Sequence, residues 1–136
     1  MLRTKKILLI DDDIDDQLYF KDAIAELNEI LQCEVANNGR EAIEQLKYPP
    51  PPDLIFLDLN MPVMNGYECL EFLKNETRYK NIPVVIFTTS KNINDIEKSK
   101  KMGAKLFFTK PTNFNILCNK LDKITKLDFT AFNFTI

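Results

Sequence analysis

Short, almost wholly apolar runs alternate along this chain with segments of helical periodicity, and this alternation restricts the possible folds more than any other feature. Three runs have the composition of strands buried on both faces of a sheet: Lys6–Ile10, Leu54–Leu57 and Val84–Phe87. Two weaker, more peripheral strands are predicted at Cys33–Ala36 and Leu106–Phe108. Helices are predicted at about 14–30, 39–47, 65–75, 92–102 and 112–126. The pattern therefore predicts an α/β fold of three layers, in which helices cover both faces of a doubly wound, parallel, five-stranded sheet.

Glycine and proline residues mark the predicted junctions between these elements. Gly39, Gly66 and Gly103 each fall between two elements, where turns and helix caps need unusual backbone angles. The run Pro49–Pro52 should end the second helix and take an extended polyproline conformation as a stiff connector. Because no internal repeat is visible, we expect one domain over residues 1–126 and a separate aromatic tail at 127–136.

The composition excludes several classes of function. The 136 residues include no histidine, which rules out Ser-His-Asp and Cys-His catalysis and imidazole metal ligands. Cys33, Cys69 and Cys118 lie too far apart to indicate a disulfide framework or a zinc site. A net charge of −2 with scattered basic residues argues against direct nucleic-acid binding. The apolar stretch near the N-terminus is too short for a membrane span or an export signal, so we expect a cytoplasmic protein.

Polar side chains stand where the predicted strands end. The sequence places Asp11, Asp12 and Asp13 after the first strand, Asp58 after the third, Thr88 and Thr89 after the fourth, and Lys110 and Pro111 after the fifth. In open parallel sheets the functional crevice lies beyond the carboxyl ends of the strands, so these groups should meet at one edge.

The chemistry of this set of side chains points to phosphoryl transfer. Crowded carboxylates repel one another unless a cation neutralises them, and oxygen ligands without histidine or thiolate favour Mg²⁺. A lysine and a hydroxyl across the cluster would supply the positive charge and the hydrogen-bond donor that phosphoryl oxygens need.

In order and spacing, the segments ILLIDDD, LIFLDLNMPVMNG, VVIFTTS and FFTKP resemble the receiver domains of two-component response regulators. The resemblance covers about residues 4–126, and its most specific part is Asp58-Leu59-Asn60-Met61-Pro62 followed by Gly66. It implies a flavodoxin-like fold and a stand-alone, chemotaxis-regulator-like receiver (phosphoacceptor) domain over 1–126. It also implies a sensor histidine kinase or phosphotransfer protein as phosphodonor and a downstream target protein as the receiver of the signal.

The resemblance also assigns roles to individual residues. Asp58 corresponds to the phosphoacceptor, and the Mg²⁺ ligands correspond to Asp11, Asp12, Asp58 and the backbone carbonyl of Asn60. Thr88 corresponds to the switch hydroxyl and Lys110 to the phosphate-binding lysine. Thr89 matches the small residue whose N–H faces a phosphate oxygen, Phe107 matches the aromatic switch, and Pro111 matches a proline that family members often hold in a cis peptide bond. The isomer at Pro111 is left open by the sequence.

A signalling mechanism follows from these roles. On phosphorylation the Thr88 hydroxyl is drawn in and Phe107 rotates inward, which changes the surface of the fourth helix, fifth strand and fifth helix. Such a domain is not an enzyme in the usual sense, since it catalyses only its own phosphorylation and dephosphorylation. We expect a monomer or a phosphorylation-linked homodimer that contacts neither nucleic acid nor membrane directly.

Other interpretations remain open at this point. Taken singly, each of these residues has an ordinary structural explanation. Asp11 and Asp12 suit a helix cap or a solvated loop, Thr88 suits a strand end, Lys110 suits a surface charge and Phe107 suits the core. A haloacid-dehalogenase-like, Mg²⁺-dependent phosphatase would use Asp11 as nucleophile but leaves Asp58 unexplained. A flavodoxin-like FMN binder would suffer repulsion from three aspartates at its phosphate loop, and a degenerate receiver acting only as a binding module would lack one of the key residues.

The tail at 127–136 alternates apolar and polar residues and carries three phenylalanines. The alternation slips by one between Ala131 and Phe132, so a single flat strand would send its apolar side chains to opposite faces. A disordered terminus is one alternative. We favour an ordered tail that packs on its own domain or on a second copy, near the surface that changes with phosphorylation.

Overall fold

Five parallel strands form a single sheet in the computed structural model, which describes residues 4–27 and 30–129. The strands are β1 (Lys5–Ile10), β2 (Leu31–Ala36), β3 (Leu54–Leu57), β4 (Val84–Thr88) and β5 (Leu106–Thr109). Their order in the sheet is β2-β1-β3-β4-β5. In the register, Leu57 lies beside Ile10 of β1 and Ile86 of β4, so β3 is the central strand.

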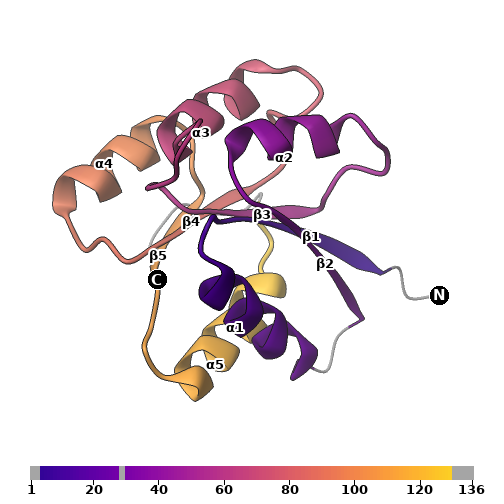
Figure 1. Ribbon diagram of the computed structural model, residues 1–136, viewed down its shortest axis with the longest axis vertical. Helices are drawn as coiled ribbons and strands as arrows, with labels where there is room; N and C mark the ends of the chain where they lie inside the picture. Colours follow the sequence, from indigo (N-terminus) through magenta and orange to yellow (C-terminus); the bar gives the residue numbers. More distant parts are fainter. Residues whose placement is uncertain (1–3, 28–29, 130–136) are drawn as a thin grey trace.

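Five helices cover the two faces of this sheet (Figure 1). They are α1 (Ile14–Ala25), α2 (Gly39–Leu46), α3 (Gly66–Asn75), α4 (Ile93–Lys101) and α5 (Phe114–Thr125). Figure 1 shows α2, α3 and α4 on one face and α1 with α5 on the other. The predicted three-layer, doubly wound (βα)5 fold of the flavodoxin-like type is confirmed. None of the helices that the structure describes has the length and apolar character needed to cross a membrane.

A side chain caps the amino end of each helix and fixes where it starts. Asp13 caps α1, and its carboxylate accepts the Asp16 N–H; asparagines cap the other four helices in the same way, at positions 38, 65, 92 and 113. Such caps satisfy N–H groups that have no partner within the helix. Because every helix follows its strand after a short loop, the five helix starts lie near the carboxyl edge of the sheet.

The core consists of two apolar layers, one on each face of the sheet. The layer beneath α1 and α5, which we call the aromatic core layer, holds four phenylalanines among aliphatic side chains: the Phe20 and Phe56 rings lie 5.0 Å apart, and the Phe87 and Phe108 rings lie 5.1 Å apart. The opposite layer, beneath α2, α3 and α4, is largely aliphatic. The near-complete burial of β1, β3 and β4 explains why their sequences are continuous apolar runs.

The structure differs from the sequence-based expectation in two local features. Helix α1 ends at Ala25 and not near residue 30, because the chain has to turn before β2, which pairs from Leu31 with Lys5. The run Pro49–Pro52 is not the uniform extended connector that we predicted, since the Pro49–Pro50 peptide bond is cis.

The start of the aromatic tail lies against the domain itself. Leu127 and Phe129 pack on the aromatic core layer. They also line a pocket together with Lys5 and Leu54, which begin β1 and β3. These two residues therefore lie at the amino edge of the sheet, packed on their own domain. The remaining tail residues, 130–136, lie outside the described residues.

Candidate functional site

Backbone hydrogen bonds hold two aspartates at the carboxyl edge of the sheet. The Asp11 N–H donates to the Ala36 carbonyl at 3.0 Å, and the Asp58 N–H donates to the Ile10 carbonyl at 3.0 Å. The sheet pairing thus continues one residue beyond β1 and β3. This continuation fixes both carboxylates relative to the rigid centre of the fold.

Asp11, Asp12 and Asp58 form one carboxylate cluster. An oxygen from each lies within 4.8 Å of an oxygen from each of the others. Asp11 is fully buried and Asp58 is 6% exposed, whereas Asp12 is exposed. Burial raises the pKa of Asp11 to about 6, with a smaller rise from the charge of Asp58, although Lys110 and the Asp13 N–H act in the opposite direction.

This donor set fits a hard divalent cation. The three carboxylates offer only oxygen ligands, they converge on one point, and one of them reaches solvent. Mg²⁺ prefers such ligands and keeps several waters, so a partly open cluster suits it. Asn60, two residues after Asp58, is exposed.

Lys110 is the positive centre of the site. Its Nζ lies 2.8 Å from Asp11 Oδ2, 2.7 Å from Asp16 Oδ2 and 3.5 Å from Asp58 Oδ2. Burial by itself would lower the pKa of Lys110, but the contacts with Asp11 and Asp16 outweigh it and the pKa is raised. Lys110 is therefore a permanent cation placed against the carboxylate that the sequence marks as phosphoacceptor.

Asp16 is a member of this site that sequence reasoning missed. It lies in the first turn of α1, and the cap at Asp13 directs that turn toward the carboxyl edge. The available signal was its position three residues after the capping Asp13, in the first turn of the helix that follows the first strand.

The other predicted site residues lie at the end of β4 or on the loops that follow β4 and β5. Thr88 ends β4 and is fully buried, and its carbonyl accepts the Lys110 N–H at 2.7 Å. Thr89, the next residue, is exposed. Pro111 is partly exposed, and its bond to Lys110 is trans, since the cis bond found among the described residues joins Pro49 and Pro50.

The loop from Asp58 to α3 is tightly folded. A Cβ at Gly66 would overlap the Asp58 carbonyl oxygen and lie 2.6 Å from Leu59 Cα, so only glycine fits there. Val63 has a φ of 69°, and the Met64 N–H donates to the Pro62 carbonyl at 2.7 Å across it. This is a strained turn for a β-branched residue. The loop is thereby held in one shape next to the phosphoacceptor position.

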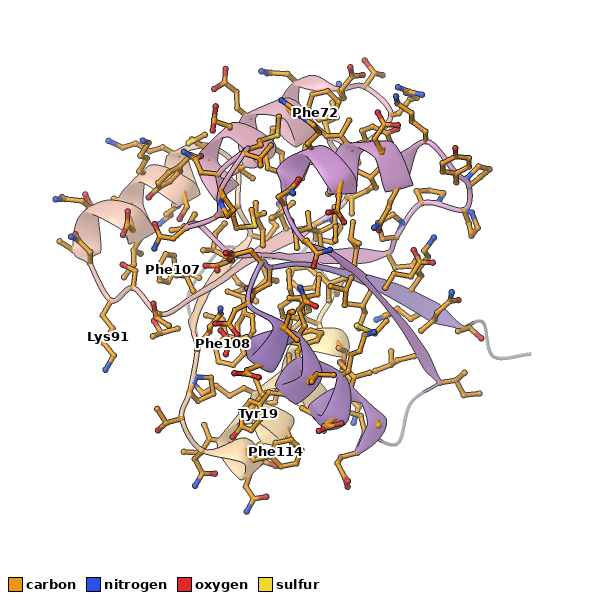
Figure 2. The ribbon with its side chains drawn as sticks, viewed as in Figure 1. Tyr19, Phe72, Lys91, Phe107, Phe108 and Phe114 are labelled. Atoms are coloured by element: carbon orange, nitrogen blue, oxygen red, sulfur yellow. The ribbon has the colours of Figure 1, made fainter. Side chains whose placement is uncertain are left out.

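Phe107 lies inward in this structure. Its side chain is 3% exposed and belongs to the aliphatic core layer beneath α2, α3 and α4. Figure 2 shows Phe107 and Phe108 on opposite sides of β5, as expected for neighbouring residues of a strand. This burial fits an ordinary core residue as well as the inward position of the aromatic switch.

A hydrogen-bond network that the sequence did not reveal joins the site to α3 and α4. The Ser90 hydroxyl, two residues after Thr88, donates to Asp95 at 2.6 Å, and the Tyr67 hydroxyl donates to the other oxygen of Asp95. The Lys98 ammonium lies 4.0 Å from the centre of the Tyr67 ring. The loop after β4 is therefore tied to the amino end of α4 through Asp95.

Comparisons with known proteins agree with this geometry. A family model described as the response regulator receiver domain matches residues 7–122. The phosphorylated cyanobacterial phytochrome response regulator RcpA superposes with a TM-score of 0.84 at 32% identity, covering 91% of this chain and 93% of that one. The Mn²⁺-bound form of response regulator Rcp1 gives a TM-score of 0.81 at 28% identity, covering 95% and 97%.

A curated relative is larger than this chain. Stress response regulator protein 1 of Candida albicans is 28% identical over 131 residues, covering 90% of this chain and 44% of the relative. The chain thus spans less than half the length of that protein.

Proposed function

The chain belongs to the response regulator receiver family, and on that basis we propose that it accepts a phosphoryl group on Asp58 and passes the signal to a partner protein. Receiver domains are signalling domains, so the product of the chemistry is the phosphorylated domain itself, which then acts as the signal. The observation that carries the proposal is the position of Asp58. It lies in a carboxylate cluster at the carboxyl edge, with Lys110 Nζ 3.5 Å away.

The metal ligands proposed here are Asp11, Asp12, Asp58 and the backbone carbonyl of Asn60. These residues would hold Mg²⁺, which supplies positive charge for the phosphoryl oxygens when it is bound. The converging carboxylate oxygens support this assignment, as does the Mn²⁺-bound state named for the related Rcp1.

The proposed donor is a phosphohistidine on a sensor histidine kinase or phosphotransfer protein. An Asp58 oxygen attacks the phosphorus in line, the new O–P bond forms as the N–P bond breaks, and the electron pair of that bond returns to the donor imidazole. Lys110 offsets the negative charge on the phosphoryl oxygens, and the Thr89 N–H faces one of them. Because such donors are made from ATP inside the cell, we also propose a cytoplasmic location.

The proposed signal depends on Thr88 and Phe107. The Thr88 hydroxyl turns toward the phosphoryl group, and the space it leaves stabilises Phe107 in its inward position. Phosphorylation would act by raising the population of a pre-existing arrangement in which Phe107 lies inward. The surface of α4, β5 and α5 then binds a downstream target protein or a second copy of the chain, without direct contact to nucleic acid or membrane.

The proposal is tested by comparing two aspartate variants. Purified protein is incubated with acetyl phosphate and Mg²⁺, and the phosphorylated fraction is measured by phosphate-affinity electrophoresis. Asp58→Asn should show no phosphorylated band. The matched control is Asp122→Asn, because Asp122 is a surface residue paired with Lys126 on α5. Equal labelling of Asp58→Asn and the parent would refute the assignment.

A further inference from the structure

The pocket that Leu127 and Phe129 line lies at the amino edge of the sheet, opposite the edge that carries Asp58. Its volume is about 550 Å³. Lys5, Leu54, Pro83 and Lys105 line it from the starts of β1, β3, β4 and β5, and Lys74 lines it from the last turn of α3. A cavity of this size is within the range of small-molecule sites.

The walls of this cavity, which we call the amino-edge pocket, carry an excess of positive charge. Four lysines line it, at positions 5, 74, 80 and 105, against the two aspartates Asp53 and Asp128. Within the described part of the chain, none of the four lysines forms an ion pair with a carboxylate.

Lys74 is held in a fixed position within the amino-edge pocket. Its Nζ donates to the carbonyls of Lys80 at 3.2 Å and Ile82 at 3.0 Å. Its aliphatic stem lies against Gly103, where an added Cβ would be 3.2 Å from Lys74 Cγ. Burial lowers the pKa of Lys74, and the charge of Lys105 lowers it further. Lys74 and Lys105 thus place two positive charges on the wall of the same pocket, and neither forms an ion pair with a carboxylate of the described residues.

The remaining wall of the amino-edge pocket is apolar. Leu54 is buried, and the partly buried side chains of Leu127 and Phe129 pack on the aromatic core layer next to it. A ligand that matches both walls needs a doubly charged group for the two ammoniums and an apolar body for Phe129. Lysine, a compact point charge, is a common partner of phosphate groups.

We propose that the amino-edge pocket binds a small organic phosphate, with the phosphate at Lys74 and Lys105 and the apolar part against Phe129. This site is separate from the carboxyl-edge site and does not depend on the function proposed for Asp58. The ammonium groups give charge attraction, and the Phe129 ring gives contact area for the organic part.

The experiment uses phenylphosphonate as the probe, because its P–C bond prevents transfer of the phosphoryl group to Asp58. The full chain, labelled with ¹⁵N, is titrated in a buffer without divalent cations, and amide shifts give the site and the Kd. Saturable shifts should cluster at residues 74, 80–83, 105 and 127–129. Lys105→Gln and Lys74→Met should each weaken binding roughly tenfold. The methionine keeps the unbranched stem against Gly103, so that variant separates loss of charge from loss of packing.

Two controls make the result specific. Lys91→Gln and Lys101→Gln change the net charge equally but lie on exposed parts of the β4–α4 loop and α4, so they should bind the probe like the parent. Inorganic phosphate should bind more weakly than phenylphosphonate, because it lacks the apolar part. Shifts that cluster at Asp58 and Lys110, or equal weakening by the control variants, would overturn the proposal, as would the absence of saturation.

Discussion

At the scale of single residues, the site depends on one lysine whose positive charge offsets the negative charge of several carboxylates. Lys110 contacts Asp11, Asp16 and Asp58, and the burial of Asp11 makes that compensation necessary for the folded state. Asp12 differs from these residues because it is exposed. Its carboxylate adds to the repulsion in the cluster while remaining available to an incoming cation.

Asp12 therefore gives a prediction about metal-dependent stability. Mg²⁺ binds the native state and should raise the Tm of the parent. At a Mg²⁺ concentration of 100 times Kd, the free energy of unfolding should rise by about 2.7 kcal/mol. Asp12→Ala should lose most of this rise, and without metal it should melt at or above the parent because one repelling charge is gone. Thermal melts with and without Mg²⁺ measure both effects. Asp22→Ala, on the exposed face of α1, is the control; an Asp12→Ala response equal to that of the control would remove Asp12 from the site.

Asp95 gives a prediction about pH. Hydrogen bonds from Ser90 and then Tyr67 lower the pKa of Asp95 below its usual value of 3.8. A carboxyl whose folded pKa is depressed stabilises the fold above its unfolded pKa, and this contribution is lost as the pH falls through the folded pKa. Asp95→Ala should therefore lower the Tm at pH 7. The corresponding loss in the free energy of unfolding is about 1 kcal/mol. The difference from the parent should shrink below about pH 4.

Asp15→Ala is the matched control for Asp95, because Asp15 is an exposed acid in the first turn of another helix. Melting curves from pH 3 to pH 7 separate the two cases, since Asp15 has no comparable pair of hydroxyl donors among the described contacts. A Tm difference for Asp95→Ala that stays constant over this range would contradict the proposed role of the Ser90–Asp95–Tyr67 network.

At the scale of elements, the loop between β3 and α3 is the part whose shape most directly sets the site. It carries Asp58 at one end and Gly66 at the other, and the Gly66 N–H donates to the Leu59 carbonyl at 2.9 Å. The cap at Asn65 and the reciprocal hydrogen bond from its N–H to Glu68 then start α3 at a defined residue. A change in the loop should therefore move Asp58 as well as lower stability.

Gly66→Ala tests this coupling. The new methyl group would meet backbone atoms of Asp58 and Leu59, which cannot move aside without displacing the loop. We expect a loss of roughly 3 kcal/mol in unfolding free energy and a weaker Mg²⁺ response. Gly39→Ala is the comparison, because its methyl group would meet mainly the flexible end of Met64 at 2.7 Å. Chemical denaturation of both variants should rank Gly66→Ala as clearly the more damaging, and the reverse order would contradict this account.

At the scale of the whole molecule, the parallel sheet separates two edges with different chemistry. The carboxyl edge collects carboxylates around Lys110, and the amino edge collects the lysines of the amino-edge pocket. Part of this arrangement was predictable, because strand ends in a parallel sheet must share an edge. That rule alone was enough to predict from the sequence that Asp11, Asp58 and Lys110 lie close together.

The contacts that the sequence did not predict depend on side-chain directions across separate elements. Asp16 reaches Lys110 only because α1 begins at a particular angle, and Asp95 meets Tyr67 only because α3 and α4 lie side by side. Periodicity places residues on a helix or strand but does not fix how two helices pack. The early end of α1 has a similar origin, since good helix formers continue past Ala25 while the sheet pairing of β2 ends the helix.

The start of the tail gives a prediction for the whole domain. Leu127 and Phe129 pack on the aromatic core layer, so a chain ending at residue 126 should melt below a chain ending at residue 129. The expected difference is about 2 kcal/mol in unfolding free energy, from the apolar area that becomes exposed. Differential scanning calorimetry of both chains measures it. Equal melting temperatures would show that these two residues add nothing to the stability of the domain.

The central claim is that this chain carries a phosphoryl group on Asp58, and locating that group tests it most directly. Protein treated with acetyl phosphate and Mg²⁺ is reduced with borohydride, which converts an aspartyl phosphate to homoserine, and the digested peptides are sequenced by mass spectrometry. We expect homoserine at position 58 and unmodified aspartate at positions 11, 12 and 16. Homoserine at Asp11 with intact Asp58 would contradict the account, as would the absence of homoserine from a protein that binds Mg²⁺.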